Sequence, residues 1–157
     1  MIIIQDSNEK IGHHDNIEQY CDKNSIALYR ERLEVGDYML ATFTNGRICP
    51  IGDISVDVKG GGLTELATDL YRDKQAFNKK YSKCYKNKIK LVVLVEEEVK
   101  GIKDIVNWKS PHTRITGKCL LEMMHEIKIM YGVKFMFCKK EKVGETVVRI
   151  LTEGNNE

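Results

Sequence analysis

The sequence predicts an α/β fold in which helices flank a central mixed β-sheet. Residues 54–59 alternate apolar and polar side chains with the period of two that a strand requires. Residues 90–95 form the near-continuous apolar run of a central strand that is covered on both faces. Between them, residues 63–85 carry apolar side chains at helical spacing. Strands interleaved with helices in this way are typical of α/β proteins.

The N-terminal half is predicted to supply most of the remaining strands. Residues 2–5 read as a short buried strand, and a helix capped at Asp15 or Asn16 runs to about Lys23. Residues 25–33 fit either a strand or a loop, and we favour a strand. Residues 37–44 and 48–51 are predicted to pair across the tight-turn signal Asn45-Gly46.

The C-terminal half is predicted to be mainly helical. We expect a short helix at 102–108, a helix from Thr116 to Tyr131, a strand at 133–138 and a helix at 143–151. Trp108 has two readings, since a lone tryptophan can stack on a base but more commonly packs over a sheet.

Length and composition indicate one globular domain. The chain has 157 residues, of which 42% are apolar and 31% charged. We expect a single domain at 1–152 and a flexible tail at 153–157. The sequence contains neither a membrane span nor a signal peptide, so we expect a cytoplasmic protein with no membrane partner. Five widely spaced cysteines without a C-x-x-C indicate neither a disulfide framework nor a zinc cluster.

The candidate chemistry centres on Asp57 and Lys59. The strand period puts both side chains on one face. Alone, such a pair would be read as a surface ion pair worth about 0–1 kcal/mol. However, Asp37 opens an earlier strand, and Glu65 begins the helix that follows three glycines. Such carboxylates can bind a hard divalent cation, and Lys59 can steady an attacking water. This combination of groups is typical of a phosphodiesterase.

Three motifs occur in a fixed order along the chain: Asp6-x-x-Glu9, Gly36-Asp37-Tyr38, and Asp57-x-Lys59 followed by an acid that opens a helix. This order resembles the XPF/Hef-type nuclease domain of the PD-(D/E)xK superfamily over nearly the whole chain. The resemblance implies a restriction-endonuclease-like core, in a stand-alone bacterial or phage form. It also implies Mg²⁺ or Mn²⁺ as cofactor and cleavage of branched or flapped DNA.

The resemblance also implies roles for individual residues. Asp37, Asp57 and Glu65, with the Val58 carbonyl, would hold the metal, and Lys59 would activate the water. Asp6 and Glu9 are additional candidate acids. The family has Glu-Arg-Lys, three spacers and Asp, whereas here Leu63 stands at the last position, and Glu65 takes that place if two glycines are read as an insertion.

Positive charge is concentrated after the candidate site. Residues 72–90 carry eight basic residues and one acid, although the net charge of the chain is only +2. A lysine-rich helix face is most often simply solvated, but this segment lacks interleaved acids and therefore favours binding to phosphates. The candidate DNA-binding residues are Arg72, Lys74, Lys79, Lys80 and Lys83.

The histidines beside the first helix have no assigned role. His13 and His14 are adjacent and point in different directions, so we do not expect them to share a metal, although a role near a phosphate stays open.

Three hypotheses follow. The first is a metal-dependent DNA endonuclease acting as a homodimer or with a partner protein. The second is an inactive DNA-binding or dimerising module of the same fold. The third is an unrelated α/β enzyme, which ranks last because the sequence contains neither a Walker loop nor a Gly-x-Gly-x-x-Gly motif.

Overall fold

A mixed seven-stranded sheet forms the centre of the computed structural model, which describes residues 1–10, 12 and 14–154. The strands lie in the order β2-β1-β3-β5-β6-β7, and β4 pairs with β3 off this path. Their bounds are β1 (Ile2–Asp6), β2 (Ala27–Glu31), β3 (Tyr38–Thr44), β4 (Arg47–Pro50), β5 (Ile54–Lys59), β6 (Lys90–Glu96) and β7 (Lys134–Cys138). β3 runs antiparallel to β1, β4 and β5, whereas β5, β6 and β7 are parallel.

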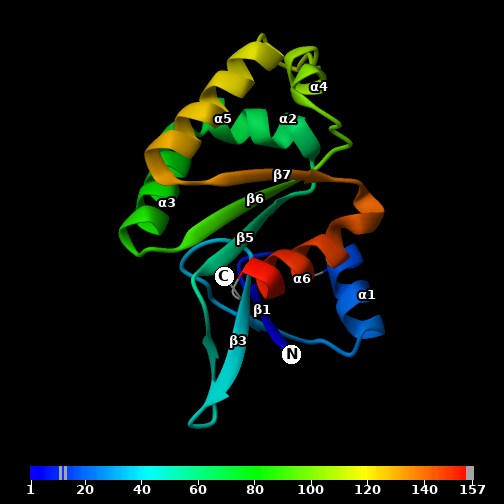
Figure 1. Cartoon of the computed structure of the whole chain (residues 1–157), viewed down its shortest axis with the longest axis vertical. Coiled ribbons are helices and arrows are strands. Elements are labelled where there is room, and N and C mark those ends of the chain that lie inside the picture. The colour runs from blue at the N-terminus through cyan, green and yellow to red at the C-terminus, as the bar shows by residue number, and fades with distance from the viewer. Residues whose placement is uncertain (11, 13, 155–157) are drawn as a thin grey trace.

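Helices cover both faces of this sheet (Figure 1). α1 (Asp15–Lys23) and α6 (Val143–Glu153) cover one face, and α2 (Gly62–Ala67), α3 (Lys74–Lys86), α4 (Ile102–Val106) and α5 (Gly117–Tyr131) lie on the other. Central strand β6 serves both layers, since Val93 packs toward α2 and α5 while Leu94 packs toward α1 and α6. The predicted α/β class with helices flanking a mixed sheet is therefore confirmed.

The prediction of one continuous helix over 63–85 is wrong. α2 ends at Ala67 and is followed by a π-helical segment, η1 (Thr68–Arg72), before α3 begins at Lys74. The Asp73 N–H donates to the Thr68 carbonyl, 3.2 Å away and five residues earlier, which is the bond of a π turn. The apolar stripe predicted for this helix accordingly has a gap between Leu70 and Phe77.

Most of the other predicted elements are present with shifts of one or two residues. Asn45 and Gly46 adopt positive φ in the β3–β4 turn, at 52° and 74°. The Thr116 side chain accepts the Cys119 N–H at the start of α5, and Gly132 ends that helix in the left-handed region. His13 and residues 155–157 lie outside the described residues. No described helix has the length and apolar character needed to span a membrane.

Candidate active site

β5 carries Asp57 and Lys59 on the face that α2 and α3 cover. The predicted alternation is present, because Val56 and Val58 pack into the opposite layer. Asp57 is only 2% exposed and Lys59 only 4%. Reading the two residues as a surface ion pair is therefore wrong, and their charges lie in an interior where unpaired charge is costly.

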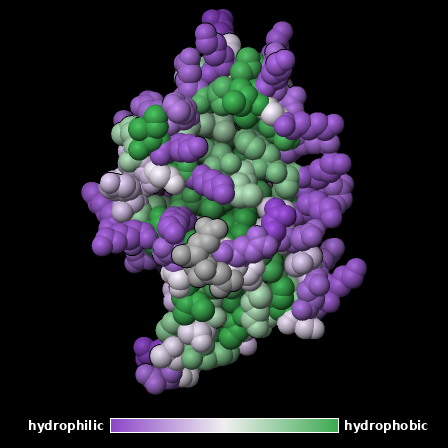
Figure 2. All heavy atoms as spheres, viewed as in Figure 1, coloured by the Kyte–Doolittle hydropathy of each residue, from purple (hydrophilic) through white to green (hydrophobic). Residues whose placement is uncertain are grey.

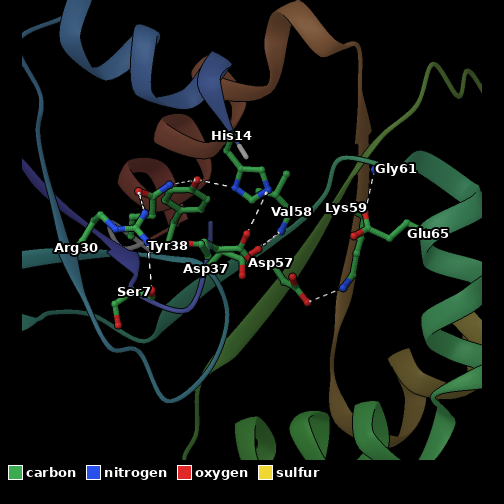
Figure 3. Close-up of polar contacts among 12 residues, drawn as sticks. Ser7, His14, Arg30, Asp37, Tyr38, Asp57, Val58, Lys59, Gly61 and Glu65 are labelled. Carbon is green, nitrogen blue, oxygen red and sulfur yellow. Dashed lines mark hydrogen bonds and ion pairs between the residues drawn. The ribbon is translucent and has the colours of Figure 1, made fainter. Parts of the chain in front are cut away.

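The Gly36-Asp37 turn brings a second carboxyl to Asp57. Gly36 has φ +75°, and a Cβ at this position would lie 2.0 Å from the Ser55 Oγ, so a side chain has no space here. This close approach lets the Asp37 N–H donate to the Val56 carbonyl at 2.8 Å. The Val58 N–H in turn donates to Asp37 Oδ2 at 2.7 Å, as Figure 3 shows, which fixes this carboxyl beside β5.

The two buried carboxyls influence each other. Burial and the negative charge of Asp57 raise the pKa of Asp37 well above its ordinary value, against the lowering effect of the Val58 N–H. Burial also raises the pKa of Asp57, but the charges of Lys59 and Lys80 and hydrogen bonds from Lys80 and Asp37 outweigh it, so that this pKa is lowered. The pair therefore favours a proton on Asp37 and a charge on Asp57.

Lys59 is held by two carboxylates and an aromatic ring. Its Nζ lies 2.7 Å from Asp69 Oδ2, 3.3 Å from Asp57 Oδ2 and 4.5 Å from the centre of the Phe77 ring. Burial lowers the pKa of Lys59, but Asp57 and Asp69 outweigh burial and raise it above its ordinary value. The side chain is thus a fixed ammonium ion.

Asp69 is a site residue that the sequence analysis missed. It lies in η1, where the wider π turn brings its carboxylate to Lys59. The gap in the apolar stripe after Leu70 is the signal that indicates a change of helical phase there.

Lys80 also reaches the site, although it was predicted as an outer DNA contact. Its Nζ lies 2.9 Å from Asp57 Oδ2, so this oxygen contacts two ammonium groups. We call Asp57, Lys59, Asp69 and Lys80 the charged cluster. The other predicted basic residues, Arg72, Lys74, Lys79 and Lys83, are exposed. Lys83 pairs with Glu34 at 3.3 Å.

The structure does not bring Glu65 to the two aspartates. Glu65 Oε2 accepts the Gly61 N–H at 2.9 Å, at the start of its own helix (Figure 3). Leu63, where the family pattern has its last acid, is buried in the core. Within 1–10, 12 and 14–154, no three histidine, cysteine or acidic side chains are grouped so as to hold a metal.

The two N-terminal acids have different positions. Asp6 Oδ1 accepts the Leu33 N–H at 2.9 Å and so fixes the loop that leads to Gly36. Glu9 lies close enough for its charge to raise the pKa of Asp37, and its carboxylate is 4.0 Å from His14 Nε2. Of these two acids, Glu9 is the one positioned to influence the site electrostatically.

A second polar group lies behind Asp37. Tyr38 is fully buried, and its hydroxyl accepts from Gln5 Nε2 at 2.9 Å and lies 2.7 Å from His14 Nδ1. Gln5 Oε1 in turn accepts from Arg30 at 3.0 Å. We call these four residues the Tyr38 network, of which Figure 3 labels Tyr38, His14 and Arg30. Trp108 packs against the core on the α2–α5 side, as expected for a structural role.

A pocket of about 490 Å³ opens beside Asp37 and Lys80. Its lining combines acidic with basic side chains: Asp6, Glu9 and Glu34 with Arg32 and Lys83. The pocket thus gives small charged groups a route to the otherwise buried Asp37.

Asp37 and Asp57 suit a magnesium ion. Proteins commonly bind Mg²⁺ through one or two carboxylates, with water and substrate phosphate completing the octahedron. Burial and repulsion by Asp57 together raise the pKa of Asp37, and a cation between the two groups would relieve the repulsion. The residues present therefore fit a divalent metal held by two protein carboxylates.

Comparison with known proteins supports the fold assignment. No family model matches the chain, and no curated protein matches its sequence. XPF from Aeropyrum pernix matches with a TM-score of 0.69 and 15% identity over 98% of this chain. The structure titled XPF from Aeropyrum pernix, complex with DNA, matches with a TM-score of 0.66 and 15% identity over 99% of this chain. The chain spans 65% of the length of both, and at this identity the similarity shows a shared fold.

Proposed function

We propose that this protein is a metal-dependent endonuclease that hydrolyses phosphodiester bonds in branched or flapped DNA. The observation that carries the proposal is the buried Asp37–Asp57 pair with the Lys59 ammonium 3.3 Å from Asp57. The chain shares its fold with a protein whose structure is titled as a complex with DNA. This shared fold supports DNA as the substrate. The preference for branches rests on the motif resemblance.

In the proposed mechanism, Asp37, Asp57 and the Val58 carbonyl would hold Mg²⁺ or Mn²⁺, which would supply polarisation of the phosphate and a lowered pKa for the attacking water. Lys59 supplies a fixed positive charge for the attacking oxygen and for the charge that develops on the phosphate. Asp69 holds that ammonium in place at 2.7 Å, and the Phe77 ring covers it.

The exposed basic residues would bind the DNA backbone. Arg72, Lys74, Lys79 and Lys83 lie on η1 and α3, the segment that also carries Asp69 and Lys80. Contacts of this kind neutralise phosphates without reading sequence and weaken as salt rises. Glu65 has a capping role in this proposal, because its carboxylate binds the Gly61 N–H.

We also propose that the chain acts as a homodimer or with a partner protein. β7 ends the strand order and, within the described chain, has a strand partner on one side only. Figure 2 shows apolar atoms between α5 and β7, surrounded by hydrophilic side chains. Ile129 and Met130 on α5 are 70% and 53% exposed. Light scattering at several concentrations tests this proposal, and a strict monomer that cleaves junctions symmetrically would contradict it.

The second candidate is an inactive DNA-binding module of the same fold. It is favoured by one observation, that Glu65 does not join Asp37 and Asp57 as a third acid. Such a module would bind DNA in a salt-dependent way without cleaving it.

Cleavage assays separate the two candidates. Labelled flap, fork, Holliday-junction, single-stranded and linear duplex DNA would be incubated with Mg²⁺ or Mn²⁺ and with the native chain, Asp57→Asn or Lys59→Ala. We expect cleavage of the branched substrates that both substitutions abolish, with DNA binding retained at two salt concentrations. Binding without cleavage would support the inactive module, and the absence of both would contradict both candidates.

A further inference from the structure

The cluster contains two ammonium groups whose freedom differs. Lys59 lies in the strand, its side chain is 6% exposed, and Asp69 holds it at 2.7 Å. Lys80 projects from α3, its side chain is 29% exposed, and Asp57 is its one ion-pair partner among the residues described. Lys80 also borders the pocket beside Asp37. Of the two cations on Asp57, Lys80 is therefore the one with a route to solvent.

The charges of the cluster are balanced as they stand. Lys59 is neutralised by Asp69 and Lys80 by Asp57, so a divalent cation at Asp57 would add positive charge beside an ammonium group 2.9 Å from the same oxygen. Like charges at such separations repel strongly where solvent is largely excluded. Metal binding and the Lys80–Asp57 ion pair thus compete for one carboxylate.

We propose that Lys80 is an internal counterion of Asp57, which the divalent metal displaces so that the released ammonium binds a DNA phosphate. This inference rests on the proposed nuclease function, because it concerns the metal at the same carboxylate. It differs from that function in assigning Lys80 two successive partners. A surface lysine would contribute to DNA binding whether or not metal is present, whereas Lys80 would contribute only after the metal has bound.

Mn²⁺ binding without DNA tests the first half of the proposal. The free ion would be measured by electron paramagnetic resonance in titrations of the native chain, Lys80→Met and Lys80→Gln. We expect both substitutions to tighten Mn²⁺ binding on the order of tenfold, because they remove a competing charge. Lys79→Met is the matched control, since this neighbouring lysine is exposed, and it should leave Mn²⁺ affinity unchanged. Unchanged or weaker Mn²⁺ binding by both Lys80 variants would overturn the proposal.

DNA binding with and without a divalent ion tests the second half. Ca²⁺ would serve as the ion, with flap DNA as the ligand and fluorescence anisotropy as the readout. Lys80→Met should lower DNA affinity several-fold with Ca²⁺ and leave it unchanged without, whereas Lys79→Met should lower it equally in both conditions. An equal loss for Lys80→Met in both conditions would contradict the displacement.

Asp57→Asn separates this inference from the proposed function. If that variant binds Mn²⁺ as tightly as the native chain, Asp57 is not a metal ligand and the proposed mechanism fails together with the inference. If Asp57→Asn weakens Mn²⁺ binding while neither Lys80 variant strengthens it, the inference alone fails. Circular dichroism of every variant excludes unfolding as the cause.

Discussion

The charged cluster and the Tyr38 network are two buried polar groups on either side of Asp37, and they differ in what they hold. The cluster contains two carboxylates and two ammonium groups, and each ammonium nitrogen lies within 3.3 Å of a carboxylate oxygen. The network is held by hydrogen bonds from Gln5 to Tyr38 and from Arg30 to Gln5, and by the contact of His14 with the Tyr38 hydroxyl. Buried ion pairs contribute little net stability because desolvation offsets their attraction, whereas a hydrogen-bonded network stabilises one conformation. We infer that the charged cluster has a chemical role, whereas the Tyr38 network stabilises the local conformation around Asp37.

Removing the central carboxylate of the cluster should have the largest effect. We expect Asp57→Asn to lower the cleavage rate about a thousandfold or more, because the site loses a metal ligand and the partner of Lys80. Single-turnover cleavage of labelled flap DNA measures this. The midpoint of urea unfolding should change little, since Lys59 keeps Asp69 and Lys80 can reach solvent. A variant within tenfold of the native rate would end the assignment of chemistry to the cluster.

Removing the carboxylate that holds Lys59 should have an intermediate effect. Asp69→Asn leaves the ammonium with Asp57 at 3.3 Å as its remaining carboxylate partner. We expect a loss of about 10- to 100-fold in kcat with DNA affinity retained, as is usual when a supporting residue is removed. Steady-state kinetics separate the two quantities. A loss confined to KM would show that Asp69 acts on DNA binding rather than on the position of Lys59.

A substitution in the network should give the opposite pattern. Tyr38→Phe removes the hydroxyl that Gln5 and His14 contact, so polar groups are left buried without it. We expect the free energy of unfolding to fall by about 1–3 kcal/mol. Urea denaturation measures this change, and cleavage at a temperature where the variant is folded should stay within about threefold of the native rate. A large loss of activity in a stably folded variant would remove the distinction between the two groups.

The smallest effect is expected outside both groups. Lys79→Ala should lower DNA affinity only a few-fold and reduce the slope of log affinity against log salt by about 0.9, the value for one phosphate contact. Lys23→Ala is the matched control, because this exposed lysine ends α1 on the other face of the sheet. Equal effects of the two substitutions would show that α3 is not the DNA-binding surface.

The parts of the site that follow strand geometry were predictable. The period of two put Asp57 and Lys59 on one face. Alternating or continuous apolar runs and the Asn45-Gly46 turn signal indicated the strands, with residues 25–33 left between strand and loop. The proximity of Asp37 to Asp57 was expected from the position of Asp37 at the start of an earlier strand and from the motif resemblance. How close they lie depends on the approach of Gly36 to β5, and no local pattern contains that distance.

The parts that depend on the helix after β5 were not predicted. The apolar spacing over 63–85 predicts one continuous helix, which gives no signal for Asp69 and places Lys80 among the DNA-binding residues. Lys80 lies three residues after Phe77 and four before Cys84, which puts it on the same side as the apolar stripe, and this spacing was a usable signal. The position of Glu65 was not predictable, because the glycines at the start of α2, of which Gly62 is already its first residue, leave the direction of that helix open.

The π turn in η1 also sets how much this helix tolerates insertions and deletions. Each residue advances an α-helix by about 100°. Five residues of a π-helical segment turn through about the same angle as four α-helical residues, so deleting one residue from Thr68–Arg72 would leave the phase of α3 nearly unchanged. Deleting one residue of α3 itself, between Lys74 and Lys79, would instead rotate the rest of α3 relative to β5. Lys80 would then leave Asp57, and Tyr81 would leave the core in the same movement. The spacing within α3 is thus as constrained as the identity of Lys80.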